Sequence, residues 1–175
     1  LYHIAAAAAK EGKTLDEVAD IAQKYADAMA TISVAVRCAT HPANGESFGD
    51  LGDDDMEIGM GQHGEGGGGR QPMKSSQETI AIMANALVKD IPLQKGDKCF
   101  VMINGSGATT LMEMFILYKD CVEYLENLGI EVVANMVGEI LTVQEQAGFQ
   151  LNIAKWDEET ERLWNTPART FAFSK

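Results

Sequence analysis

The sequence is poor in several kinds of residue, and each shortage excludes a class of protein. Of its 175 residues only 3 are cysteine and 4 are proline, aromatic residues make up 7%, and 14 basic residues stand against 26 acidic ones. The resulting net charge of −12 argues against a nucleic-acid binder, which needs a basic face, and against anionic membrane surfaces as partners. No apolar run reaches the roughly 18 residues that a membrane span requires.

The few cysteines and the acidic run do not suggest a metal site. Cys38, Cys99 and Cys121 are widely spaced, odd in number and set among apolar residues. This pattern is typical of reduced core residues in a cytoplasmic protein, and it lacks the spacing of a zinc site. Asp53, Asp54 and Asp55 are adjacent, so their side chains do not converge on one ion, and we expect a solvated charge run.

The residues that are present predict one globular domain over 1–175. A hydrophobic content of 46% and this length suffice for a core of its own. The nine methionines are expected to fill that core. The chain begins Leu1-Tyr2-His3-Ile4 without an initiator methionine or a basic signal-peptide region, and we expect this start to be the middle of a helix cut from a longer parent.

Periodicity and capping signals predict alternating helices and strands. Helices are expected near 5–10, from the capping boxes at Thr14 and Ser75, before the stop at Gly129, and after Asp157. Their apolar stripes are Leu15, Val18, Ala22, Tyr25 and Met29; Ile80, Met83, Leu87, Val88 and Ile91; and Leu111, Phe115, Tyr118, Val122 and Leu125. Strands are expected at 32–36, 56–60, 99–103, 130–134 and 149–153. The fold class is therefore a layered α/β sandwich with a mixed, mostly parallel sheet.

A glycine-rich segment after the strand at 56–60 is the first candidate site. His63 lies between Gly59 and Gly69, where seven of eleven residues are glycine. Glycine allows a ligand to approach the main chain closely, and α/β proteins often place chemistry at strand ends. Spacing alone leaves open a flexible surface loop without function. His3 and His41 stand outside such a setting and are expected at the surface.

Two further segments are candidates of lesser weight. Asn104-Gly105-Ser106-Gly107 joins a strand to a helix, where free amides can bind a phosphate or other anion. It is not a P-loop, and the alternative is a structural turn with Thr109 or Thr110 as the helix cap. Thr142-Val143-Gln144-Glu145 has the pattern of a capping box on a short turn, which we assign to the fold.

Three blocks of the sequence resemble the dihydroxyacetone kinase family, in its ketose-binding (K) subunit. They are Ile58-Gly59-Met60-Gly61-Gln62-His63-Gly64-Glu65, Asn104 to Glu113, and Gly138 to Phe149, in the family's order. The resemblance runs from about Ala5 to Trp164 and covers only the C-terminal half of that subunit. The family usually has Pro-Gly where this chain has Gly66–Gly69, which leaves the choice of ketose open.

The resemblance implies chemistry at His63. In the family, the histidine at this position adds covalently to the ketose carbonyl and forms a hemiaminal. A neutral imidazole is a nucleophile, and an ordinary histidine pKa near 6.5 leaves most of it neutral at cytoplasmic pH. Gly64 allows close approach of the substrate. Glu65 is the expected partner that orients the ring or contacts a substrate hydroxyl, the alternative being a solvated loop acid.

The resemblance also implies partners. The ketose is dihydroxyacetone by default, with a longer tetrulose as the alternative. The phosphate donor, ATP or a phosphotransferase relay, is expected on a separate domain or subunit, and no cofactor or metal is expected in this chain. The general base is expected in the subunit's own N-terminal domain, and a homodimer is expected. The runner-up is a sensor or coactivator that binds ketose without turnover.

Overall fold

Residues 1–60, 67 and 69–175 are described by the computed structural model, and they contain five helices and six strands. In chain order these are α1 (Tyr2–Lys10), α2 (Leu15–Asp27), β1 (Met29–Arg37), β2 (Asp55–Ile58), β3 (Gly69–Pro72), α3 (Ser76–Asp90), β4 (Lys98–Gly105), α4 (Leu111–Asn127), β5 (Glu131–Gly138), β6 (Ala147–Trp156) and α5 (Glu158–Trp164). The expected helices and strands are all found, and β3 is the one strand that the sequence did not predict.

The strands form one mixed sheet in the order β3-β2-β1-β6-β4-β5. Among the described strands only β4 and β5 are parallel, joined by α4, whereas β6 runs antiparallel to both of its neighbours, β1 and β4. The prediction of a mixed sheet is confirmed, but the prediction that it is mostly parallel is wrong. The physical reason is that, of the sheet neighbours that follow one another in the chain, β1–β2 and β2–β3 are joined without a helix, and only β4–β5 has the helical crossover that parallel strands need.

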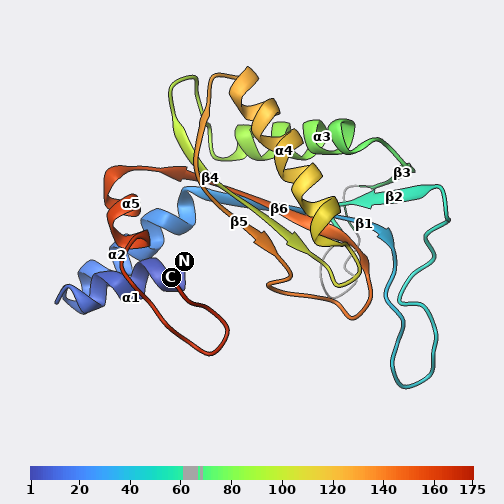
Figure 1. Cartoon of the computed structure of the whole chain (residues 1–175), viewed down its shortest axis with the longest axis horizontal. Coiled ribbons are helices and arrows are strands. Elements are labelled where there is room, and N and C mark those ends of the chain that lie inside the picture. The colour runs from blue at the N-terminus through green and yellow to red at the C-terminus, as the bar shows by residue number, and fades with distance from the viewer. Residues whose placement is uncertain (61–66, 68) are drawn as a thin grey trace.

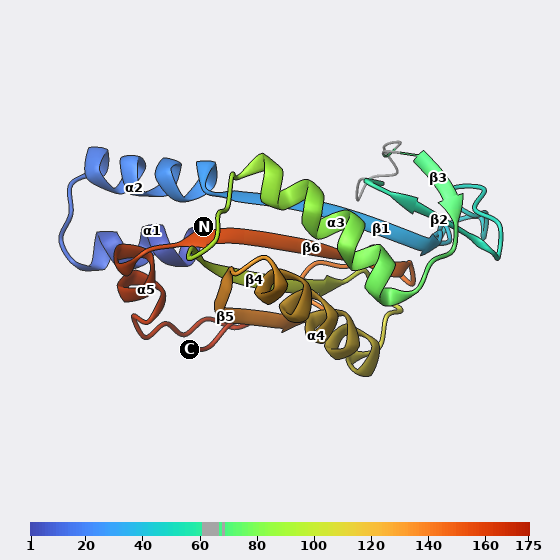
Figure 2. The ribbon, with the colours of Figure 1, turned by 90° about the horizontal axis from the view of Figure 1, so that it is seen from above.

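Helices cover the two faces of the sheet at different places (Figures 1 and 2). α3 and α4 lie on one face, where they bury a large core with the inner side chains of β1, β4 and β6. α1, α2 and α5 gather at one end, where α1 and α5 pack with Phe100, Ala154 and Trp156 in a second cluster. Among the described helices, those on the opposite face therefore cover the sheet only at that end.

Side-chain caps define the helix starts. Thr14 with Glu17 and Ser75 with Glu78 form the predicted capping boxes. A third box, between Thr110 and Glu113, starts α4. In each box the threonine or serine oxygen accepts a hydrogen bond from the main chain while the glutamate accepts from the cap's own amide. Local sequence thus fixes where these helices begin.

The apolar stripe predicted for α4 is only partly buried. Leu125 is fully buried, but Leu111 and Phe115 are 56% and 55% exposed. The side chains that face the sheet and α3 are instead Met114, Leu117 and Cys121. The residues of the predicted stripe do lie along one side of the helix, since they recur every three or four positions. However, no described residue buries the first half of that stripe. Leu15 of α2 was also predicted buried and is 82% exposed.

Several single-residue predictions can be compared with the fold. Cys99 and Cys121 are buried, as expected, while Cys38 is half-buried. His3, expected at the surface, is half-buried: its Nε2 bonds the carbonyl of Trp164 at 2.9 Å and its ring packs edge-on against that indole. His41 is also half-buried. No helix among the described residues is both long and apolar enough to cross a membrane.

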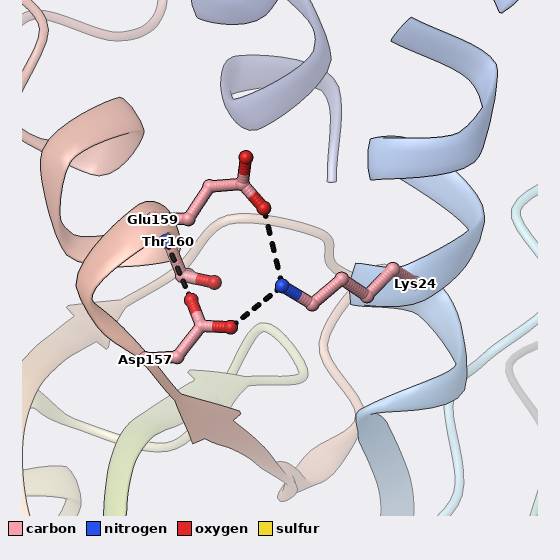
Figure 3. A network of polar contacts seen from close by, with 4 residues as sticks. All are labelled: Lys24, Asp157, Glu159 and Thr160. Carbon is pink, nitrogen blue, oxygen red and sulfur yellow. Dashed lines mark hydrogen bonds and ion pairs between the residues drawn. The ribbon is translucent and has the colours of Figure 1, made fainter. Parts of the chain in front are cut away.

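An ion-pair network ties α2 to the start of α5 (Figure 3). The Lys24 ammonium lies 2.7 Å from Oδ2 of Asp157 and 3.1 Å from Oε2 of Glu159. The other Asp157 oxygen accepts a hydrogen bond from the Thr160 amide at 2.8 Å and so caps α5. Partial burial opposes ionisation of Asp157, but Lys24 and Thr160 outweigh it and lower the pKa of Asp157 to about 2 from 3.8.

We expect this carboxylate to make the fold sensitive to acid. Because the pKa is lower in the folded protein, Asp157 stabilises the fold above about pH 4, and this contribution is lost as the pH falls towards 2. The carboxylate is nearly half exposed, so solvent screening leaves about 1 kcal/mol. Asp157→Asn should flatten the unfolding free energy between pH 4 and 2, measured by urea titration. Glu158→Gln, in the same helix turn, should leave that slope as in the unmodified protein; equal slopes in all three proteins would contradict the assignment.

Candidate functional site

The described ends of the glycine-rich loop meet at the carboxyl end of β2. Gly59 takes a positive φ of 84° and donates to the Ser33 carbonyl at 2.7 Å. The Ser33 hydroxyl donates in turn to the Met60 carbonyl. Gly67 packs so tightly on the backbone of residues 58–60 that a Cβ would overlap it, and its amide donates to Glu57 at 3.0 Å. Met60 and Gly67, which bracket residues 61–66, are thereby held at one place on β1 and β2.

His63, Gly64 and Glu65 lie outside the described residues. Their predicted roles in covalent capture and substrate contact therefore stay predictions. The structure does describe where the chain is anchored just before them: the contact between Ser33 and Met60 lies on the sheet face opposite α3 and α4. This follows because Val34, the neighbour of Ser33, is buried beneath those helices, and successive strand residues point to opposite faces.

Gln146 connects this anchor to the Asn104–Gly107 turn. Its side-chain nitrogen lies 3.9 Å from the Met60 sulfur. Its carbonyl accepts a hydrogen bond from the Ala108 amide at 3.1 Å, and it forms a bridge with Gly107. Gln146 is only 7% exposed, so the contact is part of the packed structure. Two segments that the sequence singled out separately are therefore neighbours.

Asn104 has a structural role that its side-chain contacts define. It is 1% exposed, and its Oδ1 accepts from the amides of Ile140 and Leu141 at 2.7 and 2.9 Å. Its Nδ2 donates to the Leu141 carbonyl at 2.8 Å and to Gln150 at 3.2 Å. These hydrogen bonds hold the segment after β5 against the end of β4. The buried Asn104 side chain therefore determines how the chain is arranged next to the turn.

The amides of the turn have partners inside the chain. Ser106 donates to the Gly148 carbonyl at 3.1 Å, and Ala108 donates to the Gln146 carbonyl at 3.1 Å. Burial raises the pKa of Glu139, and the nearby backbone of Gly107 opposes that increase. The Glu139 carboxylate also lies against Gly105, so an anion at this turn would meet an acidic side chain. The arrangement favours the structural interpretation, with Thr110 as the helix cap, and the phosphate-binding role stays a prediction.

The Thr142–Glu145 segment forms a turn and not a helix start. Gln146 donates to the Val143 carbonyl at 2.9 Å. The Glu145 carboxylate accepts from the Thr40 amide at 2.8 Å, and hydrogen bonds to Thr40 lower its pKa. The segment thus binds the loop after β1 to the start of β6, which is a structural role as assigned.

A cavity of about 360 Å³ lies next to the turn, on the face that carries α3 and α4. It is lined mainly by apolar side chains, including Val34 of β1, Ile116 of α4 and Met73 before α3, with Thr109 at the turn. No group of three or more metal-ligating side chains occurs in the described part of the chain. Because Met60 is anchored on the opposite face, this cavity and the loop attachment are separate features.

Sequence reasoning missed Glu139, Gln146 and Ser33. Glu139 directly follows the carboxyl end of β5, where α/β proteins often place functional side chains, but the predicted strand ended at residue 134 and so did not point to it. Gln146 and Ser33 carried no signal either: a glutamine before a strand and a serine within one become significant only through their contacts with Met60.

Fold and site together define an α/β domain with a glycine-rich loop held at the end of one strand and an Asn-Gly-Ser-Gly turn beside it. The chain belongs to the Dak1 domain family, whose model matches residues 1–172.

Individual relatives agree with this assignment. The chain is 35% identical over 159 residues to the "PTS-dependent dihydroxyacetone kinase 1, dihydroxyacetone-binding subunit DhaK" of Listeria innocua, covering 91% of this chain and 48% of that protein. It is 30% identical to an L-erythrulose kinase of Pectobacterium atrosepticum, covering 100% of this chain and 30% of that protein. A solved dihydroxyacetone kinase operon co-activator, DhaQ, superimposes with a TM-score of 0.88 at 27% identity, covering 94% of this chain and 51% of the other. The chain therefore spans about half or less of the length of these relatives.

Proposed function

We propose that this chain is the histidine-bearing half of a ketose-binding subunit in a dihydroxyacetone-kinase-type enzyme of the cytoplasm. The observation that carries the proposal is membership of the Dak1 domain family over residues 1–172, together with a histidine between glycines at the motif position. The anchoring of Met60 and Gly67 beside Gln146 supports it, because it attaches the loop next to the Asn104–Gly107 turn.

The proposed chemistry is covalent capture. A ring nitrogen of His63 adds its lone pair to the ketose carbonyl carbon, the π pair moves to oxygen, and that oxygen takes a proton. The other ring nitrogen is held by a hydrogen bond to an acceptor, for which Glu65 or a loop carbonyl is proposed, and it loses its proton to water as the alkoxide oxygen gains one, so no net proton is taken up. The product is a neutral hemiaminal that holds a terminal hydroxyl in position for phosphoryl transfer, where positioning supplies much of the rate.

The remaining parts of the reaction are proposed to lie elsewhere. The phosphate donor, through a phosphotransferase relay or ATP, belongs to a partner domain or subunit, in keeping with the name of the PTS-dependent Listeria relative. The general base belongs to the part of the subunit that this chain does not span. The preferred substrate is dihydroxyacetone. Tetruloses should be tested as well, because Gly66–Gly69 stands where the family usually has Pro-Gly and because the chain is similar to an erythrulose kinase.

A coactivator without turnover is the second candidate. It is favoured by the similarity to the DhaQ structure. The two candidates differ in activity: the kinase component phosphorylates a bound ketose when its partners are supplied, whereas the coactivator binds without product formation.

We expect the full-length protein, assayed with its phosphate donor and partner subunit, to phosphorylate dihydroxyacetone and to leave glycerol unchanged. Glycerol has similar hydroxyls but no carbonyl for the imidazole to attack. The measurement is product formation by phosphorus NMR, with mass spectrometry of the protein under mild conditions to detect the ketose adduct. Equal phosphorylation of glycerol would contradict covalent capture, and an adduct without product would favour the coactivator.

A further inference from the structure

The cavity of about 360 Å³ beside the turn has the size of a ligand site. Ligand pockets in proteins measure about 300–1,000 Å³, and an engineered cavity of about 150 Å³ already binds benzene. A second cavity, between α1, α2 and α5, is smaller, at about 220 Å³. The larger one, which we call the α3–α4 cavity, can therefore enclose a molecule about twice the size of benzene.

The lining of the α3–α4 cavity runs from the surface into the core. Met56 and Phe149 line it and belong to the main hydrophobic core. Met73 and Ile116 also line it, but they are 43% and 47% exposed. A ligand can therefore enter past adaptable side chains, of which methionine is the most flexible apolar kind, and place its apolar body where water is excluded.

Thr79 supplies a buried hydroxyl that has only a weak partner. Thr79 lines the cavity and is 6% exposed. Among the described residues its Oγ1 donates to the Met56 sulfur, at 3.8 Å, and a thioether is a weak acceptor. The hydroxyls of Ser76 and Thr109 in the same lining instead donate to a carboxylate and a carbonyl, each at 2.6 Å. Thr79 is therefore the hydroxyl that a polar group of a ligand would bind.

The charged groups of the lining favour an uncharged ligand. Among the described lining residues there is one cation, Lys74, and one anion, Glu113. The Glu113 carboxylate already accepts from the Thr110 amide and hydroxyl, at 2.8 and 2.7 Å. An anionic ligand would meet Glu113 and the field of a chain with net charge −12, whereas a cationic ligand would meet Lys74. A neutral molecule meets neither repulsion.

We propose that the α3–α4 cavity is a second ligand site, which binds a small uncharged amphiphile. The ligand has an apolar body of about eight to ten carbons and one hydroxyl or carbonyl that accepts a hydrogen bond from Thr79. The site is distinct from the proposed ketose site, because Met60 is anchored on the opposite face of the sheet. The two are nevertheless adjacent in the packing: Ala108 lines the cavity, and its amide donates to Gln146, whose side chain reaches the Met60 sulfur.

The test titrates the full-length protein, without ketose or phosphate donor, with three probes that share one tail: 1-octanol, octanoate and octylamine. Isothermal titration calorimetry should show saturable binding of one 1-octanol molecule per chain. Octanoate and octylamine should bind at least about fivefold more weakly, because each brings a charge into a site that cannot pair it fully. Since no reaction takes place in this assay, its outcome does not depend on the proposed kinase function.

Three variants assign the binding to this cavity. Thr79→Val keeps the shape of the side chain but removes the hydroxyl, and should raise the dissociation constant of 1-octanol about fivefold. Ile116→Trp places a larger side chain at the partly exposed rim and should abolish saturable binding. Ile82→Trp is its matched control, because Ile82 is also a partly exposed isoleucine, 38% exposed on α3, but does not line the cavity. Circular dichroism and thermal melts check that all three variants fold.

NMR amide signals give the location of the bound probe without a variant. The signals of Ala108 and Gly148, which line the α3–α4 cavity, should shift on addition of 1-octanol, and that of Lys155, which lines the smaller cavity, should not. Shifts at Lys155 in place of Ala108 would overturn the proposal. So would the absence of saturable binding, as when another part of the polypeptide fills the cavity, octanoate as tight as 1-octanol, or equal binding by the Ile116→Trp and Ile82→Trp variants.

Discussion

Replacing His63 with Asn or Ala is expected to lower kcat/KM for dihydroxyacetone in the full-length, reconstituted enzyme by about three orders of magnitude or more. The reason is that the covalent bond holds the reacting hydroxyl in place, and the loss of such positioning removes a large part of the rate. Neither Asn nor Ala has a nucleophile that can add to a ketone. The ketose adduct should be absent from the mass spectrum of both variants.

The same two variants are also expected to lose their selectivity for a ketose over glycerol. Without capture, the enzyme has no means to favour a ketone over a polyol, so the ratio of ketose to glycerol phosphorylation should fall towards one. His41→Asn is the matched control, because His41 is a half-buried histidine whose Nδ1 accepts only a local hydrogen bond from Ala43. A His63→Ala enzyme that kept both its adduct and its selectivity would assign the chemistry to another residue.

Substituting Gly107 with Ala is expected to destabilise the protein by at least about 3 kcal/mol. Gly107 has a φ of 130°, which side chains rarely adopt, and a Cβ there would overlap the Gln144 carbonyl. Relief of that overlap requires the turn to move away from Gln144 and from Gln146, with which Gly107 forms a bridge. Ligand affinity should therefore fall together with the free energy of unfolding, measured by urea titration and calorimetry.

Gly96→Ala separates the two causes of this loss. Gly96 also has a positive φ, of 92°, but no atom lies within 4 Å of the position of a Cβ. Its substitution should cost only about 1 kcal/mol from backbone strain and leave ligand binding intact. Equal losses for the two variants would mean that strain alone, and not the contact with Gln144, determines the effect at Gly107.

Local sequence determined the secondary elements and the family. Thr14, Ser75 and Asp157 start helices through hydrogen bonds to residues three positions away, so a short window contains the whole interaction. The continuous apolar run of β4 follows from burial on both faces. The glycine and histidine motif likewise lies within a few residues, which is why it identified the family that residues 1–172 match.

Only the tertiary structure decided how these pieces meet. β1 pairs antiparallel with β6, joining Met29 to Ala154, and no local pattern states that partner, so the predicted sheet was too parallel. The stripe on α4 shows the same limit: periodicity places Leu111 and Phe115 on one side of the helix, but whether anything covers them depends on neighbours. Gln146 became part of the site because chain folding brings Met60 and Ala108 to it, through contacts between segments that are distant in sequence.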